Sequence, residues 1–183
     1  MTWSVLLPVR TGGKSRLNAA GDWSSACGLD TLDAISGCHS VANITLLGDL
    51  PTAHRTIDDH GRGLNAEISE ALASMSRPVA VILGDLPALK SDDLDTVLNL
   101  ALHHPKAFVR DAAGAGTTLV TFTSHDAMTF FGEDSANRHS DAGFVELTSP
   151  ESVRRDVDTV DDVIAAAQMG LGKRTRELLA QLR

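Results

Sequence analysis

The sequence predicts a single α/β domain built on a mostly parallel sheet. Three observations support this prediction: short, continuously apolar runs typical of strands buried on both faces, helical apolar stripes between them, and Gly-Asp pairs at the ends of two runs. At 183 residues, the chain is long enough to bury one substantial core and short for two. No internal repeat or Pro-rich linker interrupts it, so the predicted domain spans residues 1–183.

Strand and helix patterns alternate through the first half of the chain. Buried strands are predicted at residues 3–9, 43–47 and 79–83. Apolar stripes predict helices through residues 68–75 and 94–102, and Ser91 is expected to cap the second of these helices. This alternation is typical of a parallel sheet with crossover helices.

The second half of the sequence is less regular. Short strands are expected at residues 107–109, 117–122, 145–147 and 155–157. Their close spacing indicates that part of the sheet is mixed, with one or more antiparallel strands. Thr159 and Asp162 have the spacing of a capping box, with Asp in the place of the usual Glu, before a final apolar stripe.

Composition argues against several classes of function. A net charge of −8 disfavours a nucleic-acid partner, because phosphate-backbone binding needs a dense basic face. No apolar stretch approaches the roughly 20 residues that cross a bilayer, so we expect a cytoplasmic protein with no membrane partner. Cys27 and Cys38 suit reduced thiols better than a disulfide. The sequence leaves the oligomeric state open and is compatible with a homodimer.

A glycine-containing basic loop follows the first predicted strand. Residues 10–16 read Arg-Thr-Gly-Gly-Lys-Ser-Arg, which places flexible backbone N–H groups beside three cations. This combination suits a polyphosphate. The loop is not a Walker A motif, because Pro8 stands where that motif requires glycine. A surface turn with solvated charges is the alternative interpretation.

Two aspartates are candidate metal ligands. Asp85 follows the predicted strand at residues 79–83, and Asp158 precedes the last predicted apolar stripe. Ligands of an open α/β sheet collect beyond the carboxyl ends of its strands, where these carboxylates could hold Mg²⁺ against phosphate oxygens. Neither H-E-x-x-H nor C-x-x-C occurs, so zinc is not indicated. Alternatively, Asp85 initiates a turn and Asp158 complements a helix amino end.

Residues 61–66 match the loose dinucleotide pattern G-x-G-x-x-A, with Asp85 near the distance expected of a ribose-binding acid. A nicotinamide-binding site is therefore an alternative. The segment before this motif holds little that is apolar besides Ile57, so the motif lacks the strong preceding strand that such sites require.

Taken in order, the motifs resemble the phosphoenolpyruvate or 2-phospho-L-lactate guanylyltransferases of coenzyme F-420 biosynthesis. The resemblance covers nearly the whole chain. Its motifs are Pro8-Val9-Arg10, Lys14-Ser15-Arg16-Leu17, Gly63-Leu64-Asn65, Gly84-Asp85-Leu86-Pro87, Gly116-Thr117-Thr118-Leu119, Phe131-Gly132 with Ser135, and Arg155-Asp156-Val157-Asp158-Thr159.

The resemblance implies a Rossmann-like nucleotidyltransferase fold, shared with the molybdopterin-cofactor nucleotidyltransferases, with helices on both faces of the sheet. It implies that Asp85 and Asp158 hold Mg²⁺, although Asp156 is close enough to exchange roles with Asp158. Lys14 and Arg16 would face the triphosphate and, with Asp85, carry catalysis. The implied nucleotide-binding residues are Pro8, Val9, Gly13, Lys14, Gly63, Leu64, Asn65 and Asp85, and the implied acceptor-binding residues are Thr117, Gly132 and Ser135.

The activity implied by the resemblance is transfer of GMP from GTP to phosphoenolpyruvate or 2-phospholactate, with release of pyrophosphate. Gly12-Gly13 replaces the longer insertion usual before the Lys-Ser-Arg-Leu motif, and Arg10 stands where many relatives carry Lys, so the phosphate geometry at this loop is open. Two alternatives stay open. One is a guanylyl-, cytidylyl- or uridylyltransferase of another pathway, including one acting on molybdopterin, and the other is a non-catalytic GTP-binding module.

Overall fold

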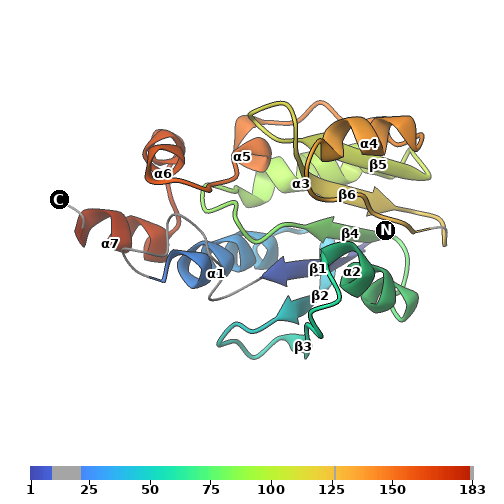
Figure 1. The fold of residues 1–183 in the computed structure, drawn as a ribbon, viewed down its shortest axis with the longest axis horizontal. Helices are drawn as coiled ribbons and strands as arrows, with labels where there is room; N and C mark the ends of the chain where they lie inside the picture. Colours follow the sequence, from blue (N-terminus) through green and yellow to red (C-terminus); the bar gives the residue numbers. More distant parts are fainter. Residues whose placement is uncertain (10–21, 126, 182–183) are drawn as a thin grey trace.

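A central sheet organises the computed structural model, which describes residues 1–9, 22–125 and 127–181. Across these ranges, seven strands form one sheet in the order β3-β2-β1-β4-β6-β5-β7 (Figure 1). The strands are β1 (Trp3–Val9), β2 (Val41–Gly48), β3 (Arg55–Ile57), β4 (Val79–Ile82), β5 (Lys106–Arg110), β6 (Thr117–Phe122) and β7 (Val145–Glu146).

Most neighbouring strands in the sheet are parallel. β1 pairs in parallel with β2 and β4, and β2 pairs in parallel with β3. β6 is antiparallel to both β4 and β5, whereas β7 is parallel to β5. The prediction of a mostly parallel, mixed sheet is confirmed. Because β6 runs against its neighbours, its first residue lies at the same edge of the sheet as the last residues of β4 and β5.

Helices cover both faces of the sheet, as predicted. α1 and α3 pack on one face, where Val5, Leu7 and Ile82 join the larger apolar core. α2 and α4 lie on the opposite face, over Leu6 and Val81 (Figure 1). The described helices are α1 (Trp23–Ser36), α2 (Leu64–Ala73), α3 (Ser91–Ala101), α4 (Ser135–Asp141), α5 (Glu151–Arg154), α6 (Val160–Ala167) and α7 (Lys173–Gln181).

Every residue of β1 is buried, which is why its sequence shows no polar alternation. A third apolar cluster joins α1 to α6 and α7, with Trp23, Val163 and Leu171 among its members. The buried Asp30 of α1 accepts the backbone N–H groups of Arg174 and Thr175, at 3.1 and 2.8 Å. The C-terminal helix is therefore anchored to the first one.

Two local predictions were wrong. Residues 155–157 form no strand: they run without regular structure from α5 toward α6, and the N–H of Val157 bonds the carbonyl of Asp85 at 3.0 Å instead of a strand ladder. Ser91 does not cap α3. It is the first residue of that helix, and its hydroxyl donates to the carbonyl of Ala34 at 2.7 Å, because α1 packs against the start of α3.

The cysteines behave as expected from the sequence. Cys27 and Cys38 are free and buried. Burial raises the pKa of each thiol to about 12, which keeps both protonated near neutral pH. None of the helices in the described ranges combines the length and apolar character that a membrane span requires.

The capping box at the start of α6 is confirmed. Thr159 Oγ1 accepts the N–H of Asp162 at 3.2 Å, and Asp162 Oδ2 accepts the N–H of Thr159 at 2.9 Å. The same carboxylate accepts the N–H of Asp158 at 3.2 Å. The capping box therefore holds the backbone of a predicted metal ligand.

We expect Thr159→Ala to lower stability by about 1 kcal/mol, the usual cost of losing such a cap. For a chain of this size, the melting temperature should fall by about 2–4 °C. Thr96→Ala is the matched control, because Thr96 is exposed within α3 and its hydroxyl only bonds the carbonyl of Asp92. Thermal melts of both variants check this prediction, and an equal fall in both would contradict it.

Candidate functional site

Predicted site residues from three separate segments gather at the edge of the sheet where β4 ends. Asp85 lies three residues beyond β4, and Thr117 begins the antiparallel β6. Leu83 N–H donates to the carbonyl of Thr118 at 3.0 Å, which joins these two segments. The hydrogen bond from Val157 N–H to the carbonyl of Asp85 adds residues 156–158 to the same edge. Asp85 and Asp158 are therefore neighbours, although 73 positions separate their numbers.

Glycines allow the strand ends to approach closely at this edge. A Cβ on Gly84 would lie 2.6 Å from Val9 Cγ2, and one on Gly48 would lie 2.0 Å from the Val9 carbonyl oxygen. Gly48 also has φ of +119°, which other residues rarely adopt. Pro8 and Val9, both predicted to contact the nucleotide, are buried at the end of β1 and lie against Gly84, the residue before Asp85.

Asp85 is partly buried, and one of its carboxylate oxygens is unpaired within the described ranges. Its Oδ1 is buried and has no hydrogen-bond partner among the described residues. The pKa of Asp85 is raised from 3.8 to about 7, first by burial and then by the charges of neighbouring carboxylates, which belong to Asp156, Asp158 and Asp111. Burying an ionised carboxylate costs free energy, and a bound cation offsets that cost.

Asp156 shares this environment. Its pKa is raised to about 6, by burial first and then by the charge of Asp111, followed by those of Asp158 and Asp162. Asp158 is exposed, whereas Asp156 is partly buried. The negative charges of both raise the pKa of Asp85, so either could be the second metal ligand.

Asp111 is an acid of this edge that sequence reasoning missed. It follows β5 as Asp85 follows β4, so its position after an apolar run was the available signal. Its carboxylate accepts the backbone N–H groups of Gly114, Ala115 and Gly116. Asp111 therefore closes the turn between β5 and β6 and adds negative potential to the edge.

The chemistry of these groups fits a hard divalent cation. Carboxylate oxygens are the ligands that Mg²⁺ prefers, and Mg²⁺ commonly takes one or two protein carboxylates together with phosphate oxygens and waters. A cation at this edge would pair with the buried Oδ1 of Asp85 and would reduce the repulsion between Asp85 and the neighbouring carboxylates. The observations support the predicted carboxylate site over a zinc site.

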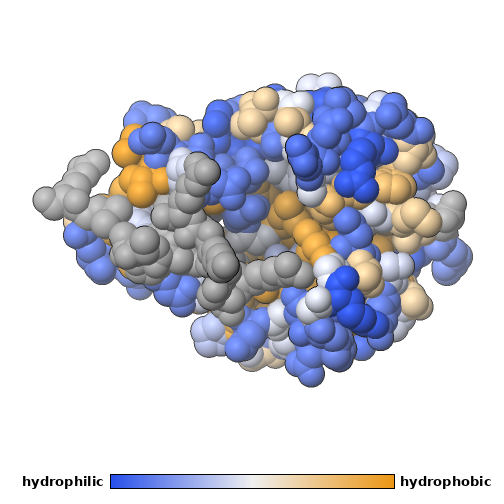
Figure 2. All heavy atoms as spheres, in the orientation of Figure 1, coloured by the Kyte–Doolittle hydropathy of each residue, from blue (hydrophilic) through white to orange (hydrophobic). Residues whose placement is uncertain are grey.

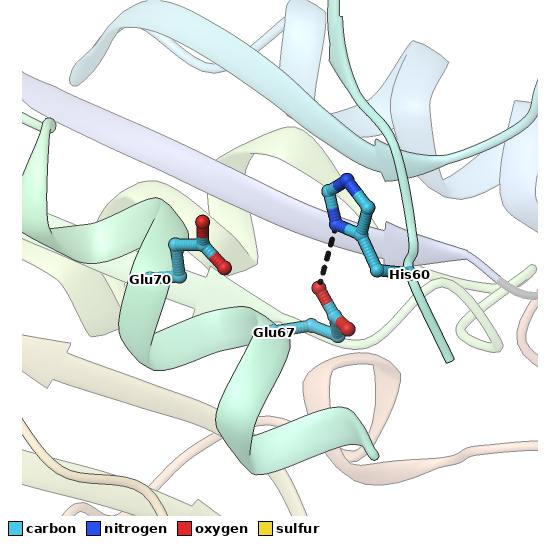
Figure 3. A group of neighbouring side chains, drawn as sticks. All are labelled: His60, Glu67 and Glu70. Carbon is cyan, nitrogen blue, oxygen red and sulfur yellow. Dashed lines mark hydrogen bonds and ion pairs between the residues drawn. The ribbon is translucent and has the colours of Figure 1, made fainter. Parts of the chain in front are cut away.

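A second cluster of ligand-type side chains, His60, Glu67 and Glu70, lies near the start of α2 (Figure 3). It already has its own cation. The Arg62 guanidinium binds Glu67 at 3.0 Å and also contacts Glu70. The buried Glu67 carboxylate further accepts the backbone N–H of Arg62 at 3.0 Å. The cluster therefore acts to hold the loop before α2 rather than to bind a metal.

The predicted nucleotide-binding residues Gly63, Leu64 and Asn65 form the start of α2. Gly63 is its N-cap residue and has φ of +101°, which explains the glycine. The Asn65 side chain is committed to the protein: Oδ1 accepts Phe131 N–H at 2.8 Å, and Nδ2 donates to the Phe131 carbonyl at 2.9 Å. Asn65 thus ties α2 to the segment that contains Gly132.

The predicted acceptor-binding residues are also brought together. Ser135 N–H donates to the Gly132 carbonyl at 3.2 Å, and Gly132 has φ of +119°. Thr117 Oγ1 lies 3.1 Å from Nδ1 of the buried His139, and the same nitrogen lies 2.7 Å from the Ser135 carbonyl oxygen. In the space-filling view, apolar side chains reach the surface in the hollow between α2 and α4 (Figure 2).

Comparison with known proteins identifies the family. The chain is 37% identical to phosphoenolpyruvate guanylyltransferase of Streptomyces coelicolor, over 100% of this chain and 98% of that protein. It is 36% identical to the protein of the same name from Streptomyces scabiei, with the same coverage. The chain belongs to the phosphoenolpyruvate guanylyltransferase family. It is thus a nucleotidyltransferase, as the resemblance of its motifs predicted. In a separate comparison, no family model matches the chain.

Solved structures confirm the fold of this family member. A protein from Desulfovibrio desulfuricans G20, proposed to be a nucleotide-diphospho-sugar transferase, superposes with a TM-score of 0.70 at 18% identity, over 100% of this chain and 95% of that one. A Mycobacterium tuberculosis H37Rv protein, solved in complex with manganese, gives a TM-score of 0.61 at 20% identity, over 91% and 98% of the two chains.

Two sets of predicted residues remain, those of the basic loop at residues 10–16 and those of the dinucleotide pattern at residues 61–66. Gly13, Lys14 and Arg16 lie outside the described residues, so their roles stay predictions. The nicotinamide alternative loses its structural basis, because residues 61–66 follow β3, a three-residue strand at the edge of the sheet.

Proposed function

We propose that this family member transfers GMP from GTP to phosphoenolpyruvate and releases pyrophosphate. The observation that carries the proposal is the buried, unpaired Oδ1 of Asp85 at the edge where Asp156, Asp158 and Thr117 also lie. A carboxylate in that state suits a divalent cation beside a triphosphate. The names of the full-length relatives supply the substrates.

In the proposed reaction, an oxygen of the acceptor phosphate attacks the α-phosphorus of GTP. A new P–O bond forms there, and the bond from the α-phosphorus to the oxygen bridging it to the β-phosphorus breaks. Pyrophosphate leaves with that electron pair. The second pKa of a phosphate monoester is near 6, so the acceptor is largely ionised at neutral pH and needs no protein base. The task of the protein is then positioning and charge stabilisation.

Asp85, with Asp158 or Asp156, would hold the Mg²⁺. The bound cation would offset the charge that develops on the phosphates. The manganese in the Mycobacterium tuberculosis protein belongs to a chain of the same fold, so it supports a divalent cation in this fold and leaves the choice of Mg²⁺ as a proposal.

The other predicted residues complete the proposed site. Lys14 and Arg16 would contact the triphosphate, and the backbone of Gly13 would approach it. Gly63 and Leu64, at the amino end of α2, would seat the guanine nucleotide. Asn65 would position this region through its bonds to Phe131, because its side-chain amide is already occupied.

Product analysis tests the proposal. The purified chain is incubated with Mg²⁺, GTP and an equimolar mixture of phosphoenolpyruvate and 2-phospholactate, and the product is identified by mass spectrometry. We expect enolpyruvyl-diphosphoguanosine, and no product when the metal is removed with a chelator. Lactyl-diphosphoguanosine as the main product would reassign the acceptor, because a pocket separates such small apolar differences weakly.

The same preparation separates the alternatives. A panel of GTP, CTP and UTP, with molybdopterin as a third acceptor, distinguishes a nucleotidyltransferase of another pathway. GTP binding without pyrophosphate release in the presence of every acceptor would favour the non-catalytic module. Sedimentation of the active protein determines whether it is a homodimer. The cytoplasmic location stays a prediction.

A further inference from the structure

His139 joins the parts of the predicted acceptor site, although sequence reasoning did not select it. The residue is completely buried on α4. Its ring nitrogens contact three segments: the start of β6 at Thr117, the first turn of α4 at Ser135, and the loop residue Phe130. Each of these segments contains or adjoins a residue predicted to bind the acceptor.

The partners of the ring determine where its proton lies. The backbone N–H of Phe130 can only donate, so His139 Nε2, 3.1 Å away, must offer its lone pair. The carbonyl of Ser135 can only accept, so Nδ1, at 2.7 Å, must carry the hydrogen. One neutral tautomer satisfies both partners, and a doubly protonated ring would set N–H against N–H at Phe130.

The surroundings keep the ring neutral and fixed. Phe108 stacks on it with a centroid separation of 5.8 Å, and Phe130, Phe131 and Phe144 meet it edge-on. Burial lowers the pKa of His139 to about 4, with a smaller contribution from the positive charge of Arg138. The ring therefore has no freedom to exchange donor and acceptor roles near neutral pH.

This tautomer has a consequence for Thr117. Because Nδ1 carries a hydrogen, the Thr117 hydroxyl, 3.1 Å away, can accept from the ring but cannot donate to it. Within the described residues, no other side-chain hydrogen bond occupies the proton of that hydroxyl. Because Nδ1 does not take the proton of this buried hydroxyl, the hydroxyl can donate it to an anionic oxygen.

We propose that His139 is a positioning residue, which through its Nδ1–H tautomer holds the Thr117 hydroxyl as a donor to a phosphate or carboxylate oxygen of the acceptor. The inference rests on the proposed function, because it takes Thr117 to contact the acceptor.

Nuclear magnetic resonance tests the tautomer directly. In ¹⁵N-labelled protein at neutral pH, the His139 signals, assigned by their loss in His139→Gln, should show hydrogen on Nδ1 and none on Nε2. Hydrogen on Nε2 would overturn the inference, whatever the enzyme catalyses.

Kinetics test the consequence. A glutamine at position 139 can still accept from Phe130 N–H but has no donor at the Nδ1 position, so His139→Gln should raise the KM for phosphoenolpyruvate about tenfold or more, as for a lost hydrogen bond to an anion. The KM for GTP and kcat should change little. His139→Asn keeps a donor near the Nδ1 position and should recover part of the loss.

A double-mutant cycle links the two residues. Thr117→Val should raise the same KM, Thr117→Ser should not, and His139→Gln should add almost nothing in the Thr117→Val background. Phe122→Leu is the control for stability. Phe122 belongs to the same apolar cluster as Phe108 and Phe144, and in the described structure its ring contacts Phe144 and not His139. It should lower the melting temperature and leave the KM for phosphoenolpyruvate unchanged.

The outcomes separate the two proposals. Absence of guanylyl transfer by the unmodified chain would refute the proposed function. Normal transfer combined with an unchanged KM in His139→Gln, or with additive effects in the double variant, would overturn the role of His139 alone.

Discussion

Replacing Asp85 with Asn is expected to reduce guanylyl transfer by at least about a thousandfold. The substitution keeps the shape of the side chain and removes the charge that would hold the cation. Electrostatic stabilisation by such a cation at the α-phosphate of GTP would be a dominant contribution to guanylyl transfer. The fold should persist, since the buried Oδ1 of Asp85 has no hydrogen bond to lose within the part of the chain that the structure describes. Pyrophosphate release measured with saturating GTP and phosphoenolpyruvate checks this prediction.

Asp49→Asn is a matched control for this experiment. Asp49 also follows a glycine at the end of a parallel strand, directly after β2, but it is exposed. Its substitution should leave turnover unchanged. Asp156→Asn and Asp158→Asn, measured beside it, identify the second ligand as the position whose loss raises the Mg²⁺ concentration needed for half-maximal rate. Undiminished pyrophosphate release by Asp85→Asn would remove Asp85 from the mechanism.

The same substitution should stabilise the metal-free protein at pH 8. The pKa of Asp85 in the folded state is about 7, above its ordinary value of 3.8, chiefly because of burial. Below about pH 4, Asp85 is protonated in both the folded and the unfolded state, so it costs the folded state nothing. As the pH rises through 7, the folded state must bear a poorly solvated charge, and the free energy of unfolding falls. Asp85→Asn therefore removes the free-energy cost of burying an ionised side chain, which the wild-type chain bears only at higher pH.

We expect Asp85→Asn to gain on the order of 1–2 kcal/mol at pH 8, after allowance for screening by solvent at the edge of the site. The melting temperature should rise by about 2–8 °C. The gain should shrink toward zero near pH 4 and should also shrink when Mg²⁺ and GTP are added, because the cation offsets the charge of Asp85 in the wild-type chain. Thermal melts across this pH range with and without Mg²⁺–GTP measure the effect, and a gain that does not depend on pH would contradict its assigned cause.

Together, the two predictions describe one property of the site. A carboxylate placed where it binds a cation well is poorly solvated when the cation is absent, so activity and metal-free stability should change in opposite directions at Asp85. Substitution of a residue with a purely structural role would lower both the activity and the stability of the metal-free protein.

Much of the fold could be predicted from local patterns. The continuously apolar run in β1 and the stripes of α2 and α3 report burial directly, because strands between two helical layers and amphipathic helices each have a characteristic period. The short strand β3 and the four-residue helix α5 could not be predicted, since neither is long enough to show a period. Residues 155–157, predicted to be a strand, are likewise too few to show a period, and the Val157 N–H bonds the carbonyl of Asp85 in a loop instead of a neighbouring strand.

The sequence by itself determined the class of fold, the order of the family's motifs and the types of side chain available for phosphate chemistry, because these depend on residue identity and spacing. Only the tertiary structure decided which of those groups meet. The antiparallel course of β6 brings Thr117 to the edge that holds Asp85, and the Val157–Asp85 hydrogen bond adds the last acids. Burial and neighbouring charges then set the state of Asp85 and His139, and both are properties of packing that no stretch of sequence contains.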